Sequence, residues 1–80
     1  MTYKQVAEIV TSCRNEVLTD PYGNEQIVYL PESGDRILLF EYGGLYIVTL
    51  NPDEQESNIG EGFTDLKDAF VRIAKLIKKK

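Results

Sequence analysis

The sequence predicts a small α+β domain, α-β-β-β-α in order, in which two helices pack on a three-stranded antiparallel meander. Three observations predict this class: an amphipathic helical pattern near the start of the chain, three short apolar runs separated by turn residues in the middle, and a second amphipathic pattern near the end. Eighty residues suit one domain of ordinary size. We therefore expect residues 1–80 to form a single α+β domain.

The first predicted helix covers residues 3–17. Thr2 and Gln5 fit a capping box, in which a hydroxyl and an amide satisfy two free backbone donors at a helix start. The helix is expected to end before Asp20-Pro21, because proline disfavours helical dihedral angles in the residue before it. One apolar stripe at helical spacing supports the assignment: Tyr3, Val6, Val10, Cys13 and Val17.

The three predicted strands cover residues 26–30, 36–42 and 45–50, which are rich in β-branched and aromatic side chains. Residues 31–35 form a turn cluster between the first two strands. Gly43-Gly44 predicts a two-residue hairpin between the last two, because glycine takes positive φ without steric cost.

The second predicted helix covers residues 65–79, with Thr64 as its N-cap. A long polar, acidic loop precedes it at residues 51–62, and a segment of that length in a compact domain is either mobile or functional. The end of the helix, residues 72–80, is basic, which suits the negative end of the helix dipole.

Both faces of the predicted sheet are largely apolar. The hairpin places Phe40 opposite Ile47 on one face and Leu39 opposite Val48 on the other, whereas a sheet with one wet side normally alternates apolar and polar residues. In one interpretation the two helices cover opposite faces, or the loop at residues 51–62 folds over one face. In the other, both helices pack on one face and the other face meets a partner. In the second case self-association is the simplest outcome.

The candidate partner-binding residues are therefore apolar positions of the sheet and acids of the long loop: Tyr29, Ile37, Leu39, Tyr46, Val48, Asp53, Glu54 and Glu56.

Charge is distributed unevenly along the chain. Residues 16–65 hold eleven acids and one base, Arg36, whereas the last fourteen residues hold six bases and one acid, Asp68. An acidic body repels phosphate backbones, so nucleic-acid binding is disfavoured except through the C-terminal lysines.

No catalytic, cofactor-binding or metal-binding constellation is recognisable. The chain has no histidine, and its single cysteine, Cys13, lies in an apolar stripe with no base to activate it. Residues 51–62 alternate oxygen ligands but lack the central glycine and closing glutamate of a calcium loop. Gly60-Glu61-Gly62 lacks the lysine of a phosphate loop. We therefore expect no enzyme, no cofactor, no metal and no small-molecule substrate.

Three sequence features bear on location. No apolar run approaches the ~20 residues that cross a bilayer, and no signal-like apolar segment opens the chain. A lone cysteine suits a reducing compartment. We expect a cytoplasmic protein with no membrane association.

The α-β-β-β-α order resembles that of double-stranded-RNA-binding domains, with Gly60-Glu61-Gly62-Phe63-Thr64 leading into the last helix. That family carries a lysine cluster where this chain has Asp65-Leu66-Lys67-Asp68, so the resemblance implies topology and not RNA binding. The short acidic chain is also similar in type to small phage and mobile-element proteins.

Taken together, these features favour a small acidic, non-catalytic protein–protein interaction module that acts as an adaptor, inhibitor or antagonist. Two alternatives remain open: a nucleic-acid-binding domain that uses the C-terminal lysines, and a small homo-oligomeric structural subunit.

Overall fold

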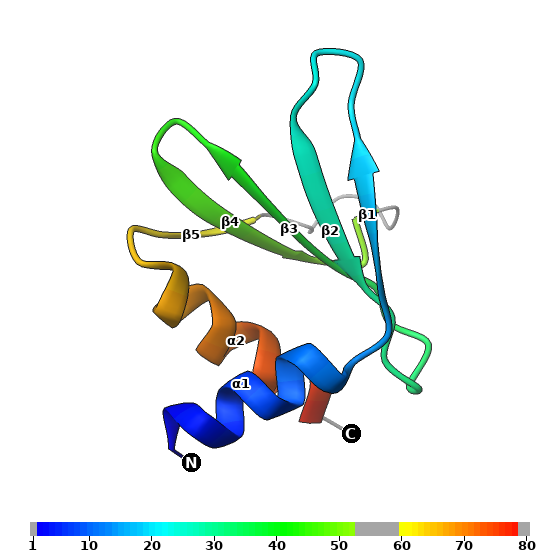
Figure 1. Ribbon diagram of the computed structural model, residues 1–80, viewed down its shortest axis with the longest axis vertical. Coiled ribbons are helices and arrows are strands. Elements are labelled where there is room, and N and C mark those ends of the chain that lie inside the picture. The colour runs from blue at the N-terminus through cyan, green and yellow to red at the C-terminus, as the bar shows by residue number, and fades with distance from the viewer. Residues whose placement is uncertain (1, 53–59, 79–80) are drawn as a thin grey trace.

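The first helix, α1, spans Tyr3–Ser12 in the computed structural model, which describes residues 2–52 and 60–78 (Figure 1). The predicted capping box is confirmed: the Gln5 N–H donates to Thr2 Oγ1 at 3.2 Å, and the Thr2 N–H donates to Gln5 Oε1 at 2.8 Å. Val6 and Val10 are buried. The prediction that the helix continues to residue 17 is wrong, because the chain becomes extended at Cys13.

Residues that we expected at the end of that helix form the first strand, β1 (Asn15–Thr19), which pairs antiparallel with β2 (Glu25–Tyr29). Asp20 shapes the turn between them: its Oδ1 accepts hydrogen bonds from the N–H groups of Tyr22 and Asn24, both at 2.9 Å. A side chain that satisfies the turn backbone in this way favours a hairpin.

The central hairpin joins β3 (Ile37–Tyr42) to β4 (Leu45–Leu50) through Gly43 and Gly44, whose φ angles are 62° and 81°. The predicted register is confirmed, with Phe40 opposite Ile47. At the other end of the hairpin, the Asn51 side chain accepts from the Arg36 N–H at 2.7 Å.

A short fifth strand, β5 (Glu61–Phe63), pairs with β4 within the segment that we had predicted to be loop. The second helix, α2 (Leu66–Lys78), follows. Its N-cap is Asp65 and not Thr64, because Asp65 Oδ1 accepts from the Lys67 N–H at 3.0 Å. Arg72 of α2 donates to the Glu61 carboxylate at 2.6 Å and so ties the helix to β5.

The sheet therefore has five antiparallel strands in the order β1-β2-β3-β4-β5 and not three. The α+β class is confirmed, and the predicted meander forms the centre of a wider one. The five-strand order also differs from the topology that the resemblance to double-stranded-RNA-binding domains implied.

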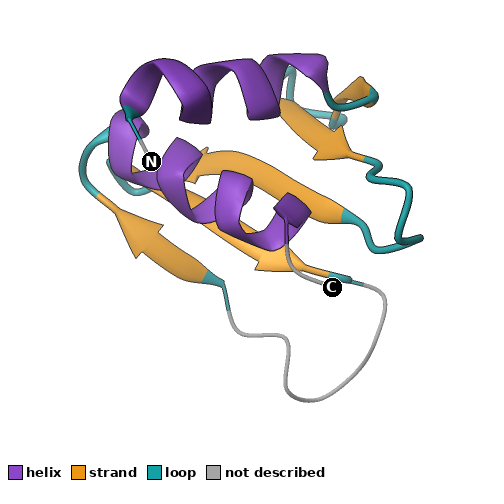
Figure 2. Ribbon diagram, turned by 90° about the horizontal axis from the view of Figure 1, so that it is seen from below, coloured by secondary structure: helices purple, strands orange, loops and turns teal. Residues whose placement is uncertain are grey.

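Both helices lie on the same face of the sheet, as Figure 2 shows from below. The core lies between them and that face. Its largest fully buried side chains are Val10 of α1, Ile73 of α2, Ile37 of β3 and Val48 of β4, each 2% exposed or less.

The two long hairpins diverge toward their tips (Figure 1). Five residue pairs join β1 to β2 and six join β3 to β4, whereas only three join β2 to β3. The last of these three pairs is Ile27 with Leu39, so the sheet is held together at one end and splayed at the other.

Candidate interaction surface

Alternation along the strands assigns each sheet residue to one of two faces, because successive side chains of a strand point to opposite sides. The face covered by the helices carries Ile37 and Leu39 of β3 and Val48 of β4, all buried. The opposite face, here called the open face, carries seven apolar side chains: Leu18, Val28, Leu38, Phe40, Tyr42, Leu45 and Ile47.

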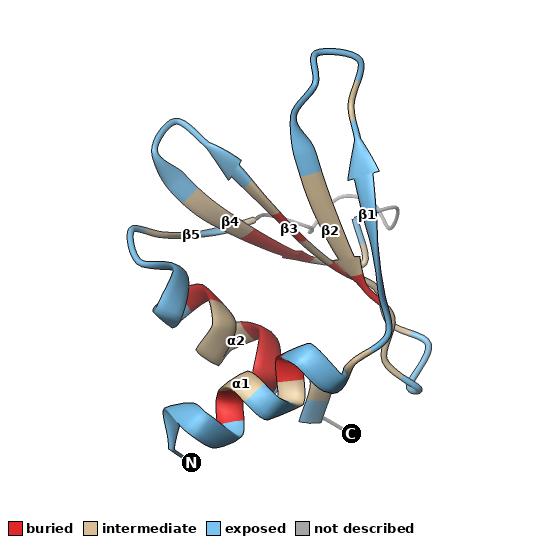
Figure 3. Cartoon of the chain, in the orientation of Figure 1, coloured by how far each residue is buried: buried red, intermediate tan, exposed pale blue. Residues whose placement is uncertain are grey.

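Exposure increases across the open face toward its edges and hairpin tips (Figure 3). Tyr42 is 75% exposed, Leu18 46% and Leu45 37%. The remaining four members are half-buried, because neighbouring side chains on one face of a sheet shield one another from solvent. Exposed apolar side chains gathered on one face of a small protein are typical of interaction sites, so the open face is the candidate surface.

Gly60 bounds the open face at the end of β4. A Cβ atom built on Gly60 would collide with Ile47 Cγ2 and would lie 2.9 Å from Thr49 Oγ1. The backbone before β5 therefore packs directly on this part of the face, where Thr49 is only 8% exposed. The accessible part of the open face lies toward the hairpin tips.

The structure places the predicted sheet residues on the covered face. Tyr29, Ile37, Leu39 and Val48 are core residues between 0% and 6% exposed, and Tyr46 is half-buried against the same core. The helices cover these side chains, and the exposed apolar residues of the sheet lie elsewhere. The predicted acids Asp53, Glu54 and Glu56 lie outside the described residues.

Residues that pair side by side across β2, β3 and β4 form rows of three, and the polarity of these rows distinguishes the two faces. On the covered face, the row Tyr29, Ile37, Leu50 and the row Ile27, Leu39, Val48 contain no strongly polar side chain. On the open face, the row through Val28 and Leu38 ends in Thr49. Complete apolar rows indicate the face that belongs to the core.

The charges of the C-terminal segment are partly engaged within the chain. Arg72 pairs with Glu61, and the Lys67 ammonium lies 4.9 Å from the centre of the Tyr3 ring, a cation–π distance. Lys75 and Lys78 are exposed near the end of α2. Lys79 and Lys80, which belonged to the predicted basic end, lie outside the described residues.

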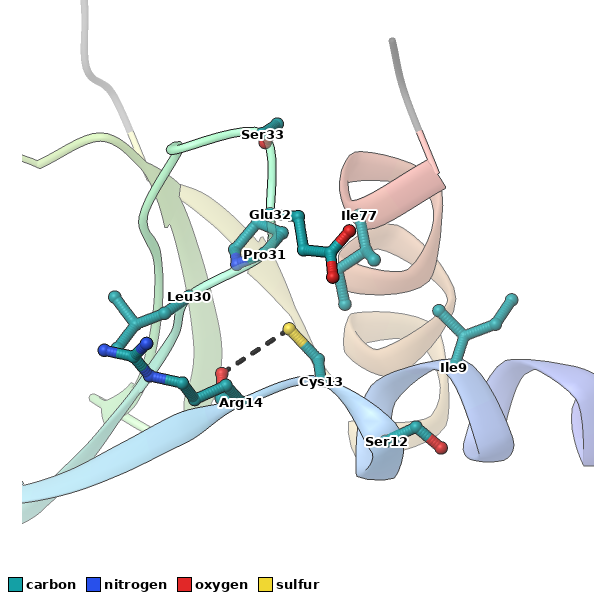
Figure 4. Close-up of a pocket in the computed structure, with 9 residues that line it drawn as sticks. All are labelled: Ile9, Ser12, Cys13, Arg14, Leu30, Pro31, Glu32, Ser33 and Ile77. Carbon is teal, nitrogen blue, oxygen red and sulfur yellow. Dashed lines mark hydrogen bonds between the residues drawn. The ribbon is translucent and has the colours of Figure 1, made fainter.

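A groove of about 980 Å³ lies between the end of α1, the turn after β2 and the end of α2. Figure 4 shows Cys13, Glu32 and Ile77 around it. The Cys13 thiol donates to the Arg14 carbonyl at 3.5 Å, and burial raises the pKa of this thiol. Burial also raises the pKa of the neighbouring Tyr29 hydroxyl. Both groups are therefore held in their protonated forms, and thiolate chemistry is disfavoured.

Within residues 2–52 and 60–78, no group of three or more cysteine, aspartate and glutamate side chains is arranged to hold a metal ion. Neither helix of the described chain has the length and apolar content needed to span a membrane. Glu61, which sits in the candidate phosphate-loop sequence, belongs to an edge strand and pairs with Arg72.

No protein-family model, no curated protein and no solved structure matches the chain.

Proposed function

We propose that the protein is a small non-catalytic interaction module that binds a partner protein through the open face. The single observation that supports this proposal is the placement of α1 and α2 on one face of the sheet, which leaves the opposite face apolar and accessible. A second protein that covers this face would remove its apolar side chains from water, and the hydrophobic effect favours such a contact.

Tyr42 and Leu45 are the expected anchors of this contact. They are paired at the tip of the central hairpin, point to the same face and are among its most exposed members. An exposed tyrosine supplies a large ring and a polar hydroxyl, a combination enriched among residues that dominate binding energies.

The charge distribution favours a partner with a basic rim around an apolar patch. Glu16 lies on the same side of β1 as Leu18, and residues 16–65 carry ten more acids than bases, since eleven acids stand against one base. Complementary charge mainly accelerates association, and salt screens that effect. The same acidity, together with the engagement of Arg72 by Glu61, weighs against nucleic acid as the partner.

Capture from an extract of the native host, followed by mass measurement of the captured protein, tests the proposal when three variants are compared with the wild type. Tyr42→Asp and Leu45→Asp place a charge on the open face, and Tyr22→Asp places the same charge on an 89% exposed turn residue. We expect the wild type and Tyr22→Asp to retain the partner and the two open-face variants to lose it. Equal capture by all four proteins, or no specific partner, would contradict the proposal.

A further inference from the structure

The outer edge of β1 is the longest open edge of the described sheet. β1 stands at one end of the strand order, and all five of its residues, Asn15–Thr19, are exposed. The other edge, β5, has only three residues, and its Glu61 side chain is held by Arg72. Proteins normally protect a long edge strand with charged side chains, especially lysine, with proline or with a bulge, because its unpaired backbone accepts another strand. β1 contains neither lysine nor proline, and its single charged residue is Glu16.

The ladder between β1 and β2 determines which backbone groups of β1 face outward. The Leu30 N–H donates to the Arg14 carbonyl at 2.7 Å, and the Asp20 N–H donates to the Asn24 carbonyl at 2.9 Å. In an antiparallel ladder, pairs that exchange hydrogen bonds alternate with pairs that do not. The even-numbered residues of β1 therefore bond to β2, and Asn15, Val17 and Thr19 direct their N–H and C=O groups away from the sheet.

We propose that β1 pairs antiparallel with β1 of a second copy of this chain, with Val17 opposite Val17 on the twofold axis. In this register Asn15 lies opposite Thr19 of the second copy. Three outward N–H and three outward C=O groups on each chain then all find partners, giving six hydrogen bonds for the pair of chains. The β-branched Val17 side chains meet each other, a favourable cross-strand contact.

Neighbouring registers satisfy fewer backbone N–H and C=O groups and place like charges opposite each other. Centring the pair on Glu16 places two glutamates directly opposite each other, which is destabilising. Centring it on Leu18 places Glu16 opposite Asp20 and Asn15 opposite Pro21, which has no N–H to donate. The Val17 register avoids each of these defects, and this self-complementarity favours a second copy of the chain as the occupant of the edge.

The proposed symmetry links the two interaction surfaces but does not depend on the proposed function. A twofold axis between antiparallel edge strands runs perpendicular to the sheet, so it keeps both pairs of helices on one side. The two open faces then form one continuous surface on the other side of a ten-stranded sheet. Loss of partner binding by an open-face variant that still dimerises would separate the two proposals.

Sedimentation of the full chain at several concentrations and about 0.15 M salt tests the pairing, because salt at that level screens repulsion between two copies of net charge −4. We expect a monomer–dimer equilibrium for the wild type. Val17→Lys places two ammonium groups opposite each other and should weaken the dimer roughly tenfold or more. Tyr22→Lys adds the same charge outside β1 and should leave dimerisation unchanged. A wild-type monomer at every concentration, or equal dimerisation of the two variants, would overturn the proposal.

Amide hydrogen exchange of the wild type gives an independent test that needs no substitution. We expect exchange at the amides of Val17 and Thr19 to slow as protein concentration rises, because dimerisation buries these N–H groups. The amides of Glu16 and Leu18 already bond to β2 and should change little. Exchange at Val17 that is independent of concentration would contradict the pairing.

Discussion

Glu25 of β2 and Glu41 of β3 are in register with each other, two residues beyond the last pair of the β2–β3 ladder, Ile27 with Leu39. Both side chains belong to the covered face by alternation, and both residues are exposed. Extending the ladder would bring two carboxylates directly opposite each other, which is unfavourable in a sheet. This repulsion opposes a longer ladder, and the two hairpins diverge beyond the Ile27–Leu39 pair (Figure 1).

Glu41→Gln should therefore stabilise the protein, by about 0.2–1 kcal/mol, because it removes one of the two facing charges. Glu25→Gln should act in the same direction. The double variant should gain less than the sum of the two, since either substitution alone ends the repulsion. Urea unfolding of the four proteins measures these differences, and destabilisation by Glu41→Gln would refute the explanation.

Neighbouring residues of β3 should respond very differently to truncation, because they lie on opposite faces. Ile37 is fully buried beneath the helices, and Ile37→Ala should cost about 2–5 kcal/mol. Leu38 is half-buried on the open face, and Leu38→Ala should cost about 1 kcal/mol. Chemical denaturation gives both values. Similar costs at the two positions would mean that both faces of the sheet are packed.

Gly60 should not tolerate a side chain, although its neighbour in the same edge segment should. Gly60→Ala drives a methyl group into Ile47 and Thr49 and should destabilise the protein by about 1–3 kcal/mol. Gly62→Ala meets the ends of the Leu45 and Ile47 side chains, at 3.2 and 3.5 Å, and should have a much smaller effect. Thermal unfolding of the two variants provides the comparison, and a Gly60→Ala protein as stable as the wild type would be inconsistent with this packing.

The stability of the first hairpin should depend on pH because of the Asp20 carboxyl group. The Asn24 backbone N–H, helped by the Asn24 side chain and the Tyr22 and Gly23 backbone N–H groups, lowers the pKa of the Asp20 carboxyl below its ordinary value of 3.8. A carboxylate with a depressed pKa in the folded state stabilises that state above the ordinary pKa. The contribution is lost as pH falls through the folded-state pKa.

Stability measured from neutral pH into the acid range should therefore decline for the wild type as Asp20 becomes protonated. In Asp20→Ala this part of the decline should be absent, and the variant should be less stable at neutral pH because the turn loses its acceptor. Identical acid profiles for the two proteins would show that Asp20 does not stabilise the turn.

The central hairpin was predictable from sequence because Gly43-Gly44 fixes the turn and the turn fixes the register of every following pair. The capping box at Thr2 was predictable because it depends only on residues three apart. Both features are local, and neither requires knowledge of what packs above the sheet.

The two edge strands were not predicted, because the residue pattern of each one also fits another structure or has little strand propensity. Cys13 and Val17 continue the helical stripe of α1, although Val17 and Leu18 also pair well with β2 across a turn closed by Asp20. β5 consists of a glutamate, a glycine and a phenylalanine, and its strand conformation comes from pairing with β4 and not from propensity. The face that the helices cover was not predictable from the hairpin alone, because two adjacent strands do not reveal which rows of side chains are apolar across the whole sheet.

Solvent paramagnetic relaxation of side-chain protons tests the central claim, a sheet covered on one face and open on the other, most directly. A dissolved paramagnetic probe should broaden the signals of Leu38, Phe40 and Ile47 and leave those of Ile37, Leu39 and Val48 sharp, so attenuation should alternate along β3 and β4. Equal protection of both sets, with only surface residues such as Tyr22 attenuated, would contradict the claim.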